Sequence, residues 1–207
     1  MSDLFAGLTT SIKSTATAIT RNEYVRKVAE SIKGRHAINV VAVSDHRRAF
    51  LWYSRAYPGS AHDSRIFRES RLHSELSSRI KKGVLLGDSA FQAERFLLKP
   101  VLDTPADSPE SRYTEALCSG RVVVEHAFGV LKRQFSALHL GLRCEPDKAG
   151  KLIAAAMCLR NAAIAMKDPE FAGENEESDD QSDDDVDTSP LAPTASAFQQ
   201  LIISRFV

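Results

Sequence analysis

A short apolar run at residues 36–43, which read HAINVVAV, limits the folds open to this 207-residue chain. β-branched side chains suit an extended backbone, and an apolar run of this length beside polar residues is typical of a buried strand. A polar turn follows at residues 44–48, and residues 49–57 return to Phe, Leu, Trp and Tyr. We therefore predict a hairpin with a longer loop over residues 36–57.

Strand and helix patterns alternate in the rest of the chain. Residues 60–63 (SAHD) have the form of a capping box, in which Ser60 would cap a helix and Asp63 would bond back to its amide. That helix is expected to run to near Gly83. Residues 84–88 (VLLGD) predict a short buried strand that ends in a carboxylate. Helical patterns return over residues 112–138 and 147–166, and this mixed order predicts an α/β or α+β domain.

The composition argues against two classes of protein, integral-membrane and secreted. No run approaches the roughly 18 apolar residues that a membrane span needs, and the first residues lack a signal-peptide pattern. Three widely spaced cysteines form neither a disulfide framework nor a C-x-x-C metal pair: Cys118, Cys144 and Cys158. We therefore expect no membrane partner and a reducing intracellular compartment.

The charges are unevenly placed, although 27 basic residues balance 27 acidic ones. Ten of the acids and one base, Arg205, lie after residue 169, so residues 1–169 carry 26 bases and 17 acids. A basic body with an acidic end favours contact with a phosphate backbone. A solvated surface with an incidental acidic end is the alternative.

The acidic end itself predicts disorder. Residues 173–188 are too polar and too charged to bury a core. The apolar residues 198–207 that follow could dock on the body or on a partner, and a loose end is the expectation.

Two carboxylates stand out by their context. Asp88 ends an apolar strand, at the kind of sheet edge where ligands commonly bind. Glu125 lies on a predicted helix, on one stripe with Arg121 four residues before it and Lys132 seven residues after it. Paired carboxylates can hold a hard cation such as Mg²⁺ that orients water, while the two bases meet phosphate oxygens. Two plainer interpretations stay open: Asp88 as a turn or cap residue, and Glu125 as a surface salt-bridge partner.

The histidines give a weaker signal. His62 and Asp63 have the look of a catalytic dyad, but the capping box accounts for Asp63 without chemistry, and we favour it. Asp45 and His46 fall in the hairpin loop, where such residues are common.

Four motifs occur in the order seen in nucleases derived from PIF/Harbinger transposases, a family of DDE superfamily endonucleases that this chain resembles. They are residues 34–43 (GRHAINVVAV), 57–67 (YPGSAHDSRIF), 86–91 (LGDSAF) and 121–132 (RVVVEHAFGVLK). The resemblance implies an α/β RNase H-like nuclease fold, with a mixed sheet flanked by helices. It also implies an Asp-Asp-Glu triad that binds Mg²⁺ or Mn²⁺ and cuts DNA.

Matched by motif, Asp88 resembles the second Asp of that triad and Glu125 the Glu. Both are therefore expected to be catalytic residues and metal ligands, with Arg121 and Lys132 at DNA phosphates. The family's first Asp lies on an early strand, but here residues 11–20 (SIKSTATAIT) hold no carboxylate.

The resemblance and this departure from it divide the chain into three parts. Residues 1–33 form a degenerate segment with an incomplete or altered first strand, residues 34–168 a transposase-derived nuclease-like domain, and residues 169–207 the acidic tail.

Three functions compete. The first is a metal-dependent DNA endonuclease in the nucleus, with the cytoplasm as a further compartment. The second is a non-catalytic, domesticated adaptor that binds DNA or, through its tail, a protein. The third is a truncated product without function.

Overall fold

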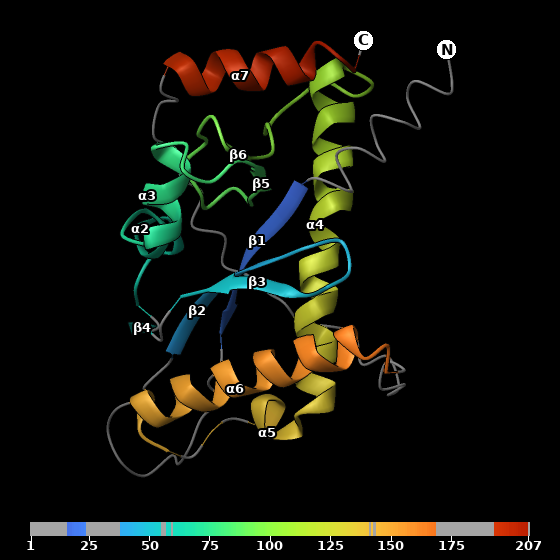
Figure 1. Cartoon of the computed structure of the whole chain (residues 1–207). Coiled ribbons are helices and arrows are strands. Elements are labelled where there is room, and N and C mark those ends of the chain that lie inside the picture. Colours follow the sequence, from blue (N-terminus) through green and yellow to red (C-terminus); the bar gives the residue numbers. More distant parts are fainter. Residues whose placement is uncertain are drawn as a thin grey trace.

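A mixed sheet organises the part of the chain that the computed structural model describes, namely residues 16–23, 38–54, 57–58, 60–140, 142, 144–168 and 193–206 (Figure 1). Its strands are β1 Ala16–Glu23, β2 Ile38–Ser44, β3 Phe50–Tyr53, β4 Tyr57–Pro58, β5 Val84–Leu86 and β6 Leu97–Leu98. They follow the order β3-β2-β1-β5-β6, with β4 paired to β2. The β1–β2 and β2–β3 pairs are antiparallel, whereas β1–β5 and β5–β6 are parallel.

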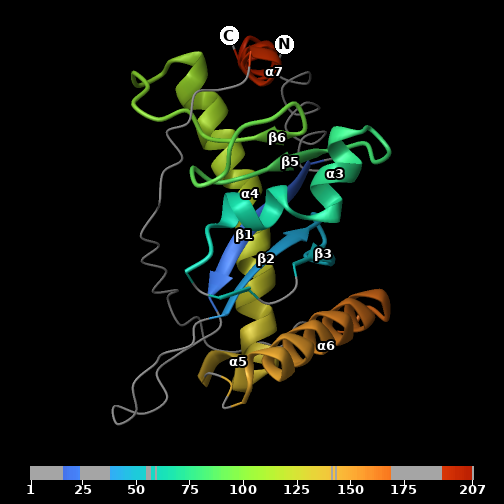
Figure 2. The ribbon, with the colours of Figure 1, turned by 90° about the vertical axis from the view of Figure 1, so that its left-hand side faces the viewer.

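Helices cover both faces of this sheet, which confirms the predicted α/β class (Figure 2). They are α2 Asp63–Arg68, α3 Arg71–Ser77, α4 Pro109–Gln134, α5 Ser136–Leu140, α6 Pro146–Ala165 and α7 Pro193–Ile203. The long helix α4 begins at Pro109 because proline suits the first turn of a helix and the preceding residue caps it. The Ser108 hydroxyl accepts a hydrogen bond from the Ser111 amide.

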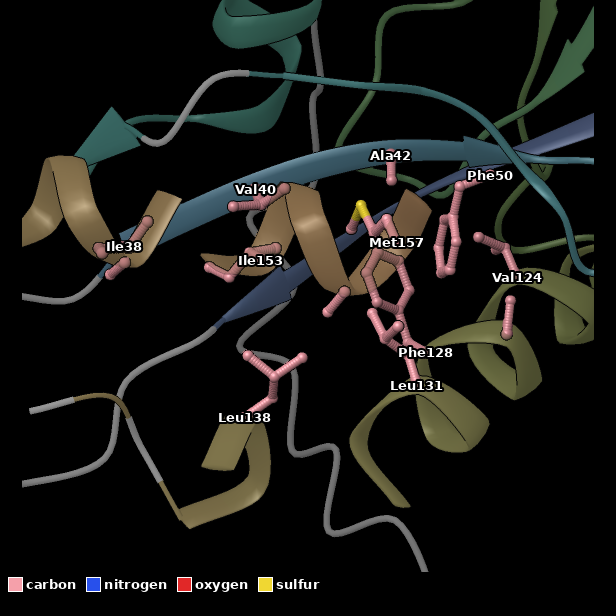
Figure 3. Packing of buried hydrophobic residues seen from close by; sticks show 13 residues of the cluster. Ile38, Val40, Ala42, Phe50, Val124, Phe128, Leu131, Leu138, Ile153 and Met157 are labelled. Atoms are coloured by element: carbon pink, nitrogen blue, oxygen red, sulfur yellow. The ribbon is translucent and has the colours of Figure 1, made fainter. Parts of the chain in front are cut away.

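Strand β2 is buried on both faces, so its side chains belong to two hydrophobic clusters, one on each face of the sheet. Alternate side chains of a strand point to opposite faces of the sheet. Ile38, Val40 and Ala42 pack against α4, α5 and α6, in the cluster shown in Figure 3. Val41 and Val43 pack on the other face, against α2 and α3. This double burial accounts for the apolar run from which we predicted a strand.

The first strand is present and central, so the sheet is not incomplete there. β1 pairs with β2 on one side and with β5 on the other. β2 therefore has a neighbouring strand along this edge. The sequence of β1 is ATAITRNE, whose one carboxylate is its last residue, Glu23, paired opposite Asn39.

The open edge of β3 is partly closed by a side chain from α6. The Asn161 amide donates a hydrogen bond to the Phe50 carbonyl oxygen at 2.8 Å, and its oxygen accepts one from the Phe50 amide at 2.9 Å. A side-chain amide thus takes the place of a neighbouring strand at this residue. It also ties α6 to the sheet.

The predicted capping box at residues 60–63 is wrong. Helix α2 begins at Asp63 with His62 at the N-cap position and no side-chain cap. The Asp63 carboxylate is buried and accepts a hydrogen bond from the Asn39 amide of β2 at 2.6 Å. The helix predicted to continue to near Gly83 is also broken in two, because Ser70 caps a new helix, α3, by accepting a bond from the His73 amide.

The apolar C-terminal segment is not a loose end. It forms α7, and Ile203 is 2% exposed in a cluster with Leu86, Leu98, Tyr113 and Leu117. The segment therefore packs on β5, β6 and the first half of α4, and its apolar residues contribute to the core. Residues 173–188, for which we predicted disorder, fall within residues 169–192, which lie outside the described residues, as do residues 1–15 and 24–37.

Candidate active site

Asp88 lies just beyond the end of β5, and its carboxylate is held in place by the backbone. Its Oδ1 atom accepts a hydrogen bond from the Ala90 amide at 2.9 Å. Leu86 packs on the face of the sheet that α4 covers, and the alternation of a strand puts Asp88, two residues later, toward the same face. The turn interpretation of Asp88 is therefore confirmed, and it aims the second oxygen, Oδ2, toward α4.

Helix α4 comes very close to β5, and a glycine permits this approach. A Cβ atom built on Gly120 would lie 2.6 Å from the Leu86 Cδ1 atom, so only glycine fits without a shift. The next residue is Arg121, and Glu125 follows one turn later. The close approach of these two elements thus brings Arg121 near Asp88, and Arg121 also contacts Glu125.

Arg121 contacts both carboxylates. Its Nη2 atom is 3.1 Å from Glu125 Oε1 and 4.0 Å from Asp88 Oδ2. The Arg121 and Asp88 side chains are 17% and 14% exposed, whereas Glu125 is 44% exposed. The salt-bridge interpretation of Glu125 is therefore also confirmed, but the pair is not an isolated surface contact, because a second carboxylate faces the same nitrogen.

The Arg121 guanidinium is incompletely paired in this arrangement. Its Nε atom is buried and has no hydrogen-bond partner among the described residues. A buried donor without a partner costs free energy, typically about 1–3 kcal/mol. Arg121 is thus held by one hydrogen bond and one longer ion pair, with a donor left over.

Lys132 lies farther along the same helix. It is half-buried and follows Glu125 by seven residues, which corresponds to roughly 10 Å along a helix axis. The structure therefore brings together three of the four predicted site residues, with Lys132 two turns away.

Among the described residues, no third carboxylate joins Asp88 and Glu125 in a metal-binding group. No group of three or more His, Cys, Asp or Glu side chains there could hold a metal ion. β1 pairs Ala18 with Leu86, and continuing this register puts Thr20 level with Asp88. Glu23 comes three residues later, roughly 10 Å farther along the strand. The continued register thus has Thr20, not an acid, level with Asp88.

Two carboxylates that face one cation still fit a hard divalent ion. Mg²⁺ is usually bound by one or two carboxylates, with waters and substrate phosphates as its remaining ligands. The guanidinium nitrogen of Arg121 acts here as a stand-in cation, since both acids face it. Asp88 and Glu125 are therefore the residues that could hold such an ion.

Two other polar pairs are formed by residues that the sequence did not single out as pairs. The buried Asn39–Asp63 pair joins β2 to α2, and it explains Asp63 as a structural residue instead of half of a dyad with His62. His73 Nε2 lies 2.7 Å from Glu94 Oε1, with the rings of Phe67 and Phe96 packed on the imidazole. The members of each pair are more than twenty residues apart, so no local pattern marked them.

The fold and the acidic pair together define a mixed α/β domain consistent with an RNase H-like nuclease fold. The chain belongs to the DDE superfamily endonucleases, whose family model matches residues 15–161. Its curated relatives include the proteins named "Putative nuclease HARBI1" of Bos taurus and of Homo sapiens, which are 32% and 31% identical to it over 136 residues. These alignments cover 64% of this chain and 39% of each relative. No solved structure matches significantly.

These findings agree with the motif-based assignment at the level of the superfamily and support a transposase-derived nuclease domain. None of the helices in the described ranges is both long and apolar enough to span a membrane.

Proposed function

We propose that this chain is a metal-dependent DNA endonuclease domain of the PIF/Harbinger type, in which Asp88 and Glu125 hold Mg²⁺ or Mn²⁺. The observation that carries the proposal is the position of Arg121 Nη2, which faces one oxygen of each carboxylate at 3.1 and 4.0 Å. Two acids from different elements converge on one cation only if the fold brings them together. We further propose that DNA is the partner and the nucleus the compartment.

The residues of the chain have separable roles in this reaction. Asp88 and Glu125 supply the oxygen ligands, and the Ala90 amide keeps the Asp88 carboxylate oriented. A divalent ion bound there would lower the pKa of a coordinated water and offset charge on the phosphate. Arg121 and Lys132 bind phosphate oxygens and position the strand. In the hydrolysis, a water oxygen bonds to phosphorus while one P–O ester bond breaks, leaving a hydroxyl and a phosphate monoester.

A nicking assay on supercoiled plasmid with Mn²⁺ tests the proposal. The wild type should nick, and Asp88→Asn and Glu125→Gln should each abolish nicking while DNA binding, measured by fluorescence anisotropy, is retained. Glu115→Gln is a matched control, because Glu115 is an exposed acid of the same helix, ten residues before Glu125. Nicking that survives in Asp88→Asn would contradict the proposed role of this carboxylate.

The altered first strand favours a second function, a non-catalytic adaptor. β1 pairs Ala18 with Leu86, and continuing this register puts Thr20, not an acid, level with Asp88. An adaptor would bind DNA or, through the acidic tail, a protein partner, but it would not cleave. The same assay separates the two: DNA binding without any nicking by the wild type supports the adaptor.

A further inference from the structure

Arg121 contacts both carboxylates that a divalent cation would need as ligands. A metal ion that bound both Glu125 Oε1 and Asp88 Oδ2 would compete with the Arg121 Nη2 atom, which now faces these two oxygens at 3.1 and 4.0 Å. We infer that Arg121 is an exchangeable counter-cation of this site: it leaves the carboxylates when a DNA phosphate binds its guanidinium, and DNA and the divalent metal therefore bind cooperatively. This inference rests on the proposed function, since it needs a metal at the same pair of acids.

The two contacts that Arg121 makes with the carboxylates are weak enough for its guanidinium to exchange them for a phosphate. Its contact with Glu125 is one hydrogen bond of 3.1 Å, and its contact with Asp88 is an ion pair of 4.0 Å. Neither is the bidentate arrangement that makes arginine–carboxylate pairs strong. The other end of the contact is accessible, because the Glu125 side chain is 44% exposed.

A phosphate offers Arg121 what the carboxylates do not. The buried Nε atom has no partner among the described residues, and a phosphate can accept from Nε and a terminal nitrogen together. The exchange thus satisfies a donor that is unpaired in the free protein. It also frees both acids of a positive charge at the moment when the substrate arrives.

Two equilibria are linked by this exchange. Without DNA, a divalent ion must compete with the resident guanidinium, so its affinity is reduced. With DNA, the competitor is withdrawn and the affinity rises. Because coupling between two binding events is reciprocal, the metal also tightens DNA binding by the same factor.

Calorimetric titration of Mn²⁺ into the full chain tests the coupling, with and without a saturating short DNA duplex, and with the duplex alone as the blank. Without DNA, Arg121→Gln should bind Mn²⁺ about tenfold more tightly than the wild type, equivalent to about 1.4 kcal/mol. The duplex should raise the affinity of the wild type by a similar factor and leave that of Arg121→Gln unchanged. Arg121→Lys, which keeps the charge, should remain close to the wild type.

Arg133→Gln is the matched control, because Arg133 is an exposed base of the same helix, twelve residues after Arg121. It should leave Mn²⁺ affinity unchanged, which excludes a general effect of net charge. Circular dichroism checks that each variant is folded, and Arg121→Met, which keeps an apolar stem, replaces Arg121→Gln if that variant is not.

The outcomes separate this inference from the proposed function. Equal Mn²⁺ affinity in wild type and Arg121→Gln, or weaker affinity in the variant, would overturn the exchange and leave the metal site standing. Absence of Mn²⁺ binding in every variant, with and without DNA, would overturn both.

Discussion

The close contact of α4 with β5 can be tested by substituting Gly120, because two effects of Gly120→Ala on stability oppose each other. Alanine is favoured over glycine in a helix by about 1 kcal/mol. The new Cβ would lie 2.6 Å from Leu86 Cδ1, and Leu86 is 2% exposed and enclosed by neighbours. Overpacking of a filled core costs about 1–3 kcal/mol. The net expectation is a loss of stability between about 0 and 2 kcal/mol.

Gly129 provides the control within the same helix. A Cβ there would meet only the Arg133 Nη1 atom at 3.6 Å, an ordinary contact. Gly129→Ala should therefore be more stable than the wild type by about 1 kcal/mol. Urea denaturation of both variants should show Gly120→Ala to be the less stable by about 1–3 kcal/mol. Equal stabilisation by the two substitutions would refute the close packing that brings Arg121 and Glu125 to Asp88.

Three further predictions concern the surrounding fold. Asn161→Leu removes the side-chain oxygen and nitrogen that bond the Phe50 amide and carbonyl. It should lower the free energy of unfolding, measured by urea denaturation, by about 2–4 kcal/mol. A loss below about 0.5 kcal/mol would contradict this edge contact. Burial, with a smaller contribution from Cys118, raises the pKa of Tyr113. The stabilisation that Tyr113 contributes is therefore full below about pH 10 and declines above it, because the phenol ionises more readily in the unfolded chain. Stability of the wild type should therefore fall more steeply than that of Tyr113→Phe between about pH 10 and 11.5 in parallel denaturation series, and equal slopes would count against this burial. Ile203→Ala should cost about 2–5 kcal/mol by thermal or chemical denaturation, whereas a loose end would leave stability unchanged.

Local patterns predicted the elements whose signals lie within a few residues. The apolar run of β2, the hairpin to β3 and the two long helices α4 and α6 were all expected from periodicity and turn residues. β1 was not, because its sequence ATAITRNE has no apolar alternation and its place depends on pairing with β2 and β5. The docking of α7 also depends on distant partners, since Ile203 packs against side chains about a hundred residues earlier.

The places of Asp88 and Glu125 in the fold were predictable from the sequence, but their common contact with Arg121 was not. Asp88 and Glu125 were chosen from a strand end and from a charged helix stripe, and both are where those patterns put them. That Arg121 faces both acids follows from the packing of α4 on β5 at Gly120, which no local spacing reveals. Asp63 was misassigned for the same reason, because its partner Asn39 lies on a different element.

Asp88 and Glu125 are proposed to form one cation site. Anomalous diffraction from crystals of the chain grown with Mn²⁺ and a short DNA duplex would locate the ion. We expect a Mn²⁺ peak coordinated by an oxygen of each carboxylate, with the Arg121 guanidinium displaced onto a phosphate. Arg121 still facing both acids, with no anomalous peak beside them, would rule out a shared cation site.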